Sequence, residues 1–156
     1  MNLDLKNTIS SVSGLIVFGW IVAAIRLFLD VNATESAMYF GVYYLMPLAY
    51  LYVGITGRLD GITWPRLALT MVVVGFFVWF VPNLITYTTA QFMGWDFGRF
   101  APGRAAPIAE GTVGKLLTGL GLGAGTMLAG TGWSIVFGSL LIYLPNQMRA
   151  NKNKGE

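Results

Sequence analysis

The amino-acid sequence predicts an all-α fold, a four-helix transmembrane bundle with one long structured outer loop. Three observations lead to this prediction. The 156 residues are 55% hydrophobic and only 11% charged, whereas a soluble domain is about 25% charged. Four apolar segments are each long enough to cross a bilayer as a helix. Six of the ten basic residues flank these segments on one side of the predicted membrane.

Each predicted span contains a run of roughly 20 mostly apolar residues, which is the length that a bilayer core of about 30 Å requires. The sequence has no linker, internal repeat or separate soluble domain, so we expect a single membrane domain over residues 1–156. The predicted spans are residues 11–29, 37–55, 67–89 and 116–144, and the outer loop is residues 90–114.

The basic residues predict the orientation, because loops rich in Lys and Arg stay in the cytoplasm. The first predicted loop carries Asp30 and Glu35 and no basic residue, although residues 90–114 carry two arginines. We therefore expect both termini in the cytoplasm and the protein in a membrane such as the bacterial inner membrane. The six residues on the cytoplasmic side are Lys6, Arg58, Arg66, Arg149, Lys152 and Lys154.

Two residue types are missing from the sequence, and their absence limits the chemistry. With no Cys and no His, the chain cannot form a thiolate or imidazole metal site, a haem ligand pair or a Ser-His or Cys-His dyad. The carboxylates all fall in expected loops or tails, which argues against an ion-coupled transporter. We expect no catalytic residue, no metal, no cofactor and no enzyme activity. The modest number of basic residues beside the spans also argues against nucleic acid as a partner.

The last span carries small residues at helical spacing, which in membranes mark faces where helices approach closely. They fall on two ridges, so we expect the helix to contact neighbours on two sides. Packing inside the bundle is one interpretation, and docking of a partner or a second copy is another. One ridge is Gly121, Gly125 and Ala129, and the other is Thr126, Gly130, Ser134 and Gly138.

Polar residues inside the other spans are candidates for a ligand site or a transport path, although structural hydrogen bonds are an alternative for each. Asn83, Thr86 and Tyr87 share one helix face. Pro82 before them predicts a kink near Val78. The remaining candidates are Tyr43, in a tyrosine-rich span, and Arg26, which has Asp30 four residues on. Arg26 either extends to water near the outer end of its span or anchors a lipid phosphate, a quinone carbonyl or a carboxylate on a partner.

The outer loop is rich in aromatic, Gly and Pro residues, and we expect it to lie at the membrane surface. Trp95, Arg99 and Arg104 are candidates for contact with lipid phosphates or with an acidic partner. The loop is too long to be a simple turn between neighbouring helices.

The leading functional hypothesis is a small, non-catalytic accessory or structural subunit of a larger energy-transducing or transport complex in the membrane. The alternative is a small homo-oligomeric channel or transporter, with Asn83, Thr86, Tyr87 and the glycines of the last span along its path. A third is a quinone- or lipid-binding membrane protein whose site contains Arg26, Tyr43 and Asn83. The expected partners are membrane lipids and either other membrane subunits or further copies of this chain.

Overall fold

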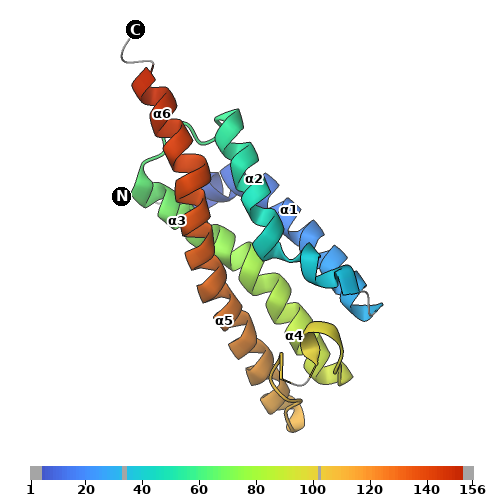
Figure 1. The fold of residues 1–156 in the computed structure, drawn as a ribbon. Helices are drawn as coiled ribbons and strands as arrows, with labels where there is room; N and C mark the ends of the chain where they lie inside the picture. Colours follow the sequence, from blue (N-terminus) through green and yellow to red (C-terminus); the bar gives the residue numbers. More distant parts are fainter. Residues whose placement is uncertain (1–4, 33–34, 102, 153–156) are drawn as a thin grey trace.

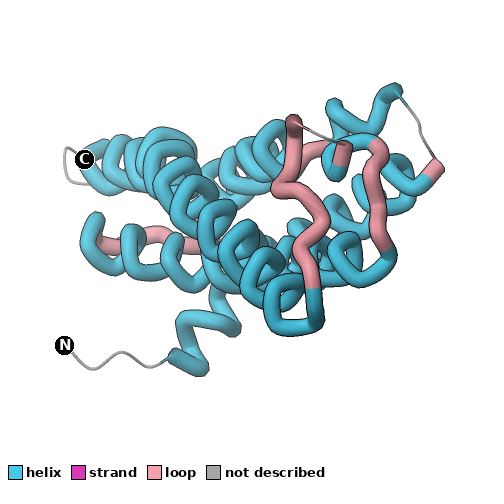
Figure 2. Tube along the Cα trace, turned by 90° about the horizontal axis from the view of Figure 1, so that it is seen from below, coloured by secondary structure: helices cyan, strands magenta, loops and turns pink. Residues whose placement is uncertain are grey.

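In a computed structural model, which describes residues 5–32, 35–101 and 103–152, the chain is a bundle of four helical rods (Figure 1). No strand occurs in those residues. The first residues of α1 and the last of α6 lie at one end of the bundle, called the termini end (Figure 2). The segment between α4 and α5 lies at the opposite end, called the loop end.

Each rod except the first contains a break in its hydrogen-bond pattern. The first rod is α1 (Leu5–Val31), and the second is the 3₁₀ turn η1 (Glu35–Phe40) followed by α2 (Val42–Thr56). The third rod is α3 (Trp64–Val74), the π-helical turn η2 (Gly75–Phe80) and α4 (Val81–Met93). After the 3₁₀ turn η3 (Gly98–Phe100) comes the fourth rod: α5 (Gly111–Gly138), the π-helical turn η4 (Ser139–Tyr143) and α6 (Leu144–Lys152).

Three rods are long and apolar enough to cross a membrane: residues 7–31, 64–93 and 111–152. The expected second span differs, because Gly41 adopts an extended conformation and separates η1 from α2. Its regular helix is only 15 residues long, which corresponds to about 22 Å. Large apolar side chains such as Leu128 and Phe28 are exposed on the outer surface of the bundle, which is typical of a surface that faces lipid rather than water.

The kink that Pro82 predicts near Val78 takes the form of a π-helical turn. Pro82 has no N–H to donate to Val78, and Val81 N–H bonds the carbonyl of Phe76, five residues back. Turns of this kind are common at functional sites. Here the wider turn directs Trp79 into the centre of the bundle, where it is buried.

A hydrogen-bonded cluster at the centre joins three of the rods. Tyr50 on α2 donates its hydroxyl to Ser134 Oγ on α5 at 2.7 Å, and Trp79 Nε1 donates to the same oxygen at 3.1 Å. All three residues are fully buried, as are Met46 and Met71 beside them. Because these side chains fill the interior, the middle of the bundle is a packed core.

Glycine allows α5 to approach the third rod closely. A Cβ atom on Gly130 would overlap the Trp79 ring, and one on Gly119 would overlap Thr88 on α4. Gly138 lies similarly against Met71. One predicted ridge, with Thr126, Gly130, Ser134 and Gly138, therefore packs inside the bundle.

The other predicted ridge faces outward. Gly121 and Gly125 have no described atom within 4 Å of the position that a Cβ would take, and Ala129 is exposed. α5 does contact two neighbours, the third rod and α2, but among the described residues the outward ridge contributes to neither contact.

Gln91 near the end of α4 holds the long loop in place. Its amide donates to the carbonyls of Ala106 and Pro107, and its Oε1 accepts from the N–H of Ala109 at 2.8 Å. The loop crosses the ends of the helices (Figure 2). These contacts bring η3, with Gly98 and Arg99, against the end of α1.

Candidate ligand-binding pocket

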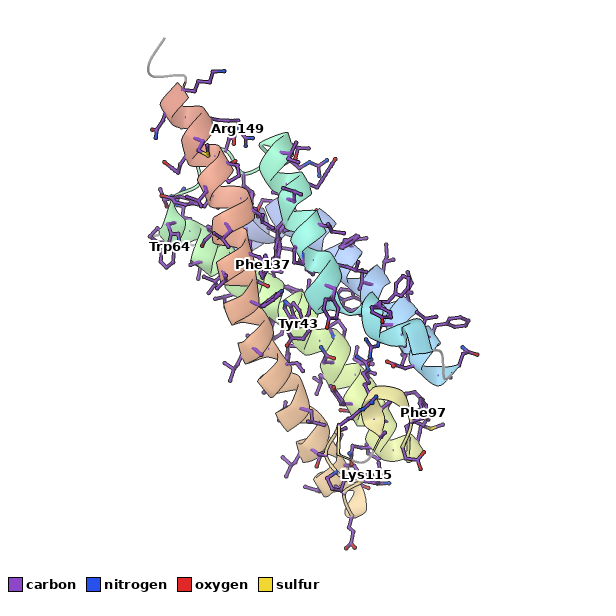
Figure 3. The ribbon with its side chains drawn as sticks, in the orientation of Figure 1. Tyr43, Trp64, Phe97, Lys115, Phe137 and Arg149 are labelled. Carbon is purple, nitrogen blue, oxygen red and sulfur yellow. The ribbon has the colours of Figure 1, made fainter. Side chains whose placement is uncertain are left out.

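A pocket of about 180 Å³ lies at the loop end, among α1, the start of α2, α4 and η3. Figure 3 shows Tyr43 between α2 and the third rod, on the same side of the bundle as Phe97 in the loop. Backbone and side chains from five parts of the sequence form its walls. They are Ala23, Arg26, Gly41, Val42, Tyr43, Trp79, Pro82, Asn83, Thr86, Tyr87, Arg99 and Thr126.

The structure brings together all of the residues that the sequence singled out as a possible ligand site or path. Arg26, Tyr43, Asn83, Thr86 and Tyr87 come from three helices and all line this pocket. The third sequence hypothesis combined Arg26, Tyr43 and Asn83 in one site, although nothing in their spacing shows that the three helices meet here.

Three further lining residues had other expected roles. Arg99 was a candidate for surface contact in the loop and Thr126 a candidate for helix packing, whereas Trp79 was part of a purely apolar run. The loop brings Arg99 to the pocket. The sequence could have identified Arg99 as a pocket residue only through a prediction of the path of the loop.

Asp30 departs most from the sequence interpretation, in which all carboxylates lie in loops or tails. It ends α1 with only 2% of its surface exposed. Arg26 Nε donates to its Oδ2 at 3.0 Å, and Arg99 Nε lies 3.1 Å from the same oxygen. Arg26 therefore pairs with Asp30 rather than extending into water. The i, i+4 spacing of Arg26 and Asp30 was the one signal of this contact in the sequence.

The backbone of the loop closes over this ion-pair cluster of Arg26, Asp30 and Arg99. Gly98 has a φ of 53°, which favours glycine. A Cβ at this position would lie 3.0 Å from Asp30 Oδ1. Glycine therefore permits both the turn and the close approach of the loop to the carboxylate.

The two guanidinium groups have hydrogen-bonding capacity that the protein does not use. In the described residues, their only contacts with acidic side chains run from Nε to Asp30. Arg99 Nε is buried without an aligned hydrogen bond. The Arg99 guanidinium lies 5.7 Å from the ring centre of Tyr87 and 5.1 Å from that of Phe100, so aromatic rings cover part of its surface.

Burial lowers the pKa of Arg99 from its ordinary value, because a charged group is disfavoured away from water. Tyr87 and Asp30 oppose this change, and the neighbouring Arg26 adds to it. An arginine still stays protonated at physiological pH. The cluster therefore carries two positive charges and one negative charge.

Trp79 separates the pocket from the core. The Tyr43 ring lies 4.3 Å from the Trp79 ring, measured between centroids. Trp133 Nε1 donates to the backbone carbonyl of Tyr43 at 3.1 Å and holds the start of α2 against α5. On its other side, Trp79 bonds Ser134 in the core.

The polar side chains beside Trp79 differ in how fully the protein uses them. Asn83 donates one amide hydrogen to the Trp79 carbonyl at 2.7 Å, and Thr86 donates to the Pro82 carbonyl, also at 2.7 Å. In the part of the chain that the structure describes, the hydroxyls of Tyr43 and Tyr87 have no hydrogen bond. Thr86 is thus occupied within its helix, whereas Asn83 and the two tyrosines retain capacity for a ligand.

The remaining predicted loop contacts lie outside the pocket. Trp95 packs against Phe97 and Phe100, with ring centroids 5.5 Å apart in both pairs. Arg104 is exposed and reaches only the Gly98 carbonyl, at 3.5 Å. Trp95 therefore stabilises the loop, and Arg104 is a surface residue.

A larger pocket of about 380 Å³ lies between α1 and α2, near the termini end. Its walls are mostly apolar, with Leu15, Phe18 and Leu48 among them and Arg58 at one side. Specific binding sites combine apolar walls with several converging polar groups. By this criterion the smaller pocket, with its two arginines, two tyrosines and Asn83, is the stronger candidate.

No protein-family model, curated protein or solved structure matches this chain. Among the described residues, no group of three or more acidic, His or Cys side chains could hold a metal ion. The side chains of the pocket are therefore the basis for a functional proposal.

Proposed function

We propose that this protein is a non-catalytic membrane protein that binds the polar head group of a lipid-like or quinone-like amphiphile in the loop-end pocket. The convergence of Arg26, Tyr43, Asn83 and Arg99 on one cavity is the observation that supports it. The cavity is smaller than the 300–1,000 Å³ typical for whole drug-sized ligands. It suits a head group, with the apolar tail in the surrounding membrane.

In this proposal all four rods cross the membrane, with η1 extending α2 toward the loop end. The termini end carries Arg58, Arg66, Arg149 and Lys152 in loops and helix ends. This excess of basic residues favours a cytoplasmic location for that end, in the inner membrane if the protein is bacterial. The head group would then bind near the outer surface.

We propose binding rather than catalysis, because the pocket lacks a free general base. No carboxylate is among the residues that line it, and the Asp30 carboxylate beside its two arginines is already held by both of them. The sequence contains no His or Cys that could take its place. The remaining groups can hold a molecule in position by hydrogen bonds and charge.

The role of accessory subunit in a larger complex is the second proposal, and the outward ridge on α5 favours it. Gly121 and Gly125 have no described neighbour, although small residues in membranes typically mark helix contacts. A second copy at this ridge would instead give the homo-oligomer of the channel hypothesis. The buried Trp79 and Tyr50 fill the core beside the pocket, which argues against a path through a single copy.

Native mass spectrometry of the protein, gently extracted from its own membrane, tests the proposal. We expect an amphiphile to remain bound to the wild type. Ala23→Phe should remove it by filling the pocket, because Ala23 lines the cavity. The adjacent Ala24→Phe is the matched control, since Ala24 is exposed and outside the pocket.

A wild type without any bound amphiphile, or a folded Ala23→Phe variant that retains it, would contradict the proposed function. Co-purification of defined larger proteins would support the accessory role. Gly125→Leu should then release those proteins without unfolding the chain, because no described atom occupies the space beside Gly125.

A further inference from the structure

We infer that the pocket selects an anionic head group, a phosphate or a carboxylate, which binds between the guanidinium groups of Arg26 and Arg99. This inference rests on the proposed function and names its ligand class. It excludes a neutral quinone or a neutral lipid as the preferred ligand.

The first argument is the charge of the ion-pair cluster. Arg26 and Arg99 share Asp30 as their only acidic partner among the side chains that the structure describes, so within this described set the two positive charges face one negative charge. The side chains of the two arginines are only 17% and 20% exposed. A partly buried, uncompensated charge is unfavourable near a membrane, and an anion in the pocket removes this imbalance.

The second argument is the kind of hydrogen-bonding group that remains free. Each arginine contacts Asp30 through Nε, which leaves its Nη nitrogens without a described partner. Two tyrosine hydroxyls and one amide hydrogen of Asn83 add to these donors. A carboxylate or phosphate is purely an acceptor when ionised, and the forked guanidinium binds it through two parallel hydrogen bonds.

The third argument is that the cluster is built into the fold. Gly98 brings the loop backbone to Asp30, and Gln91 anchors the far side of the same loop. Arg99 is therefore already at the pocket before any ligand arrives. A site with its donors in place loses less conformational entropy on binding.

The experiment compares pairs of ligands with the same hydrocarbon chains, one with an anionic head group and one with a neutral head group, added to the purified protein in neutral detergent. Dioleoyl phosphatidic acid is compared with dioleoylglycerol, and oleate with oleyl alcohol. Binding is measured by native mass spectrometry and by the shift in melting temperature. We expect at least tenfold tighter binding of the anionic member of each pair, a preference typical of charge-assisted hydrogen bonds.

Inorganic phosphate alone identifies the source of the anion. Equal stabilisation by phosphate and by phosphatidic acid supports the inference and indicates a water-soluble ligand. Stabilisation by the lipid only supports the inference and indicates a ligand from the membrane. Equal binding of charged and neutral lipids overturns the inference but leaves the proposed function intact, whereas binding of none of these ligands contradicts both.

Variants of the arginines and of Asp30 in the ion-pair cluster should change anion binding in opposite directions. Arg26→Gln and Arg99→Gln should each reduce the preference for phosphatidic acid about tenfold. Arg104→Gln, in the same loop but outside the pocket, is the matched control and should leave the preference unchanged.

Asp30→Asn should instead tighten binding of phosphatidic acid, because it removes the negative charge that repels the anion while retaining an acceptor for the Nε hydrogens of both arginines. This variant also tests the inference if the glutamine variants do not fold. A folded Asp30→Asn protein with unchanged or weaker anion binding would overturn the inference.

Discussion

The two ends of the bundle use the same local sequence feature for different purposes. Asn83 near the loop end and Asn146 near the termini end both follow a proline, and both prolines follow a π-helical turn. In each case the residue before the proline bonds a carbonyl five positions back, from Val81 to Phe76 and from Leu144 to Ser139. The backbone is thus similar, and the surroundings differ.

At the termini end the polar groups satisfy one another. Asn146 is only 3% exposed and donates to the Leu59 carbonyl in the loop between α2 and α3, at 2.8 Å. Arg149, one turn later, bonds the Asn146 side chain and forms an ion pair with Asp60 at 2.8 Å. This Pro–Asn pair therefore has a structural role, because it ties the last helix to the loop between α2 and α3.

At the loop end the corresponding Asn83 donates to the Trp79 carbonyl of its own rod, has no other side-chain hydrogen bond among the described residues, and borders a cavity. A loop carbonyl lies opposite Asn146, whereas the break at Gly41 and the start of α2 lie across the pocket from Asn83. The comparison shows that a polar residue beside a proline is not itself a site. What matters is whether the neighbouring elements use its hydrogen-bonding groups.

The largest expected effect comes from disturbing Trp79, which separates the pocket from the core. Gly130→Leu should destabilise the protein by about 3 kcal/mol or prevent folding, because even a Cβ would overlap the indole. Gly125→Leu, on the outward ridge of the same helix, is the control and should change stability little. Denaturation in mixed micelles measures both, and equal melting of Gly130→Leu and wild type would contradict the packing of Trp79.

Removing the buried carboxylate at the loop end should have a comparable effect. Asp30→Ala leaves Arg26 and Arg99 close together without a counter-ion, at a cost of about 3 kcal/mol. The same unfolding assay with and without phosphatidic acid measures this change. We expect phosphatidic acid to restore part of the stability that Asp30→Ala loses. If Asp30→Ala without ligand were as stable as the wild type, Asp30 would not be needed to balance the charges of Arg26 and Arg99.

The two asparagines should differ in the same assay by a smaller amount. Asn146→Ala leaves the buried Leu59 carbonyl without its donor, so we expect a loss of about 2 kcal/mol. Asn83→Ala should lose about 0.5 kcal/mol, since its bond is local and its side chain borders a cavity. Asn83→Ala should weaken ligand binding more than it weakens the fold. A larger loss of stability for Asn83→Ala than for Asn146→Ala would contradict the comparison of the two ends.

An effect about as small as that of Asn83→Ala is expected for the exposed ion pair at the termini end. Asp60→Ala breaks its contact with Arg149, but both side chains are more than a third exposed. Such pairs contribute about 0.5 kcal/mol and weaken as salt is added. Unfolding at low and high salt measures this contribution. If Asp60→Ala lost as much stability as Asp30→Ala, the ion pairs at the two ends would not differ as we expect.

The sequence predicted the helical class and the location of the rods, because long apolar runs require buried backbone hydrogen bonds. Their bounds differ by several residues: the span expected at 116–144 belongs to a rod over 111–152. The extended backbone of Gly41 shortens α2. The apolar composition of this segment does not reveal that break. The proline kink was correctly placed, since the missing N–H of Pro82 has a direct effect on its own helix.

The candidate site was predictable only in parts. Asn83, Tyr43 and Arg26 stood out as polar groups in apolar runs, but their meeting depends on which helices are neighbours. Asp30 was assigned to a loop because the sequence does not show its burial. That burial comes from η3, which is far away in the sequence. Long-range packing of this kind leaves no periodic pattern in a single chain.

The ion pair between Asp30 and Arg99 also has a consequence for biosynthesis. A ribosome completes α1 long before it reaches η3, so the nascent first helix enters the membrane with its carboxylate held by Arg26 alone. The pocket can form only after the third rod has inserted and the chain has returned to the end of α1. Ligand binding would therefore report that a newly made chain has passed this late step of assembly.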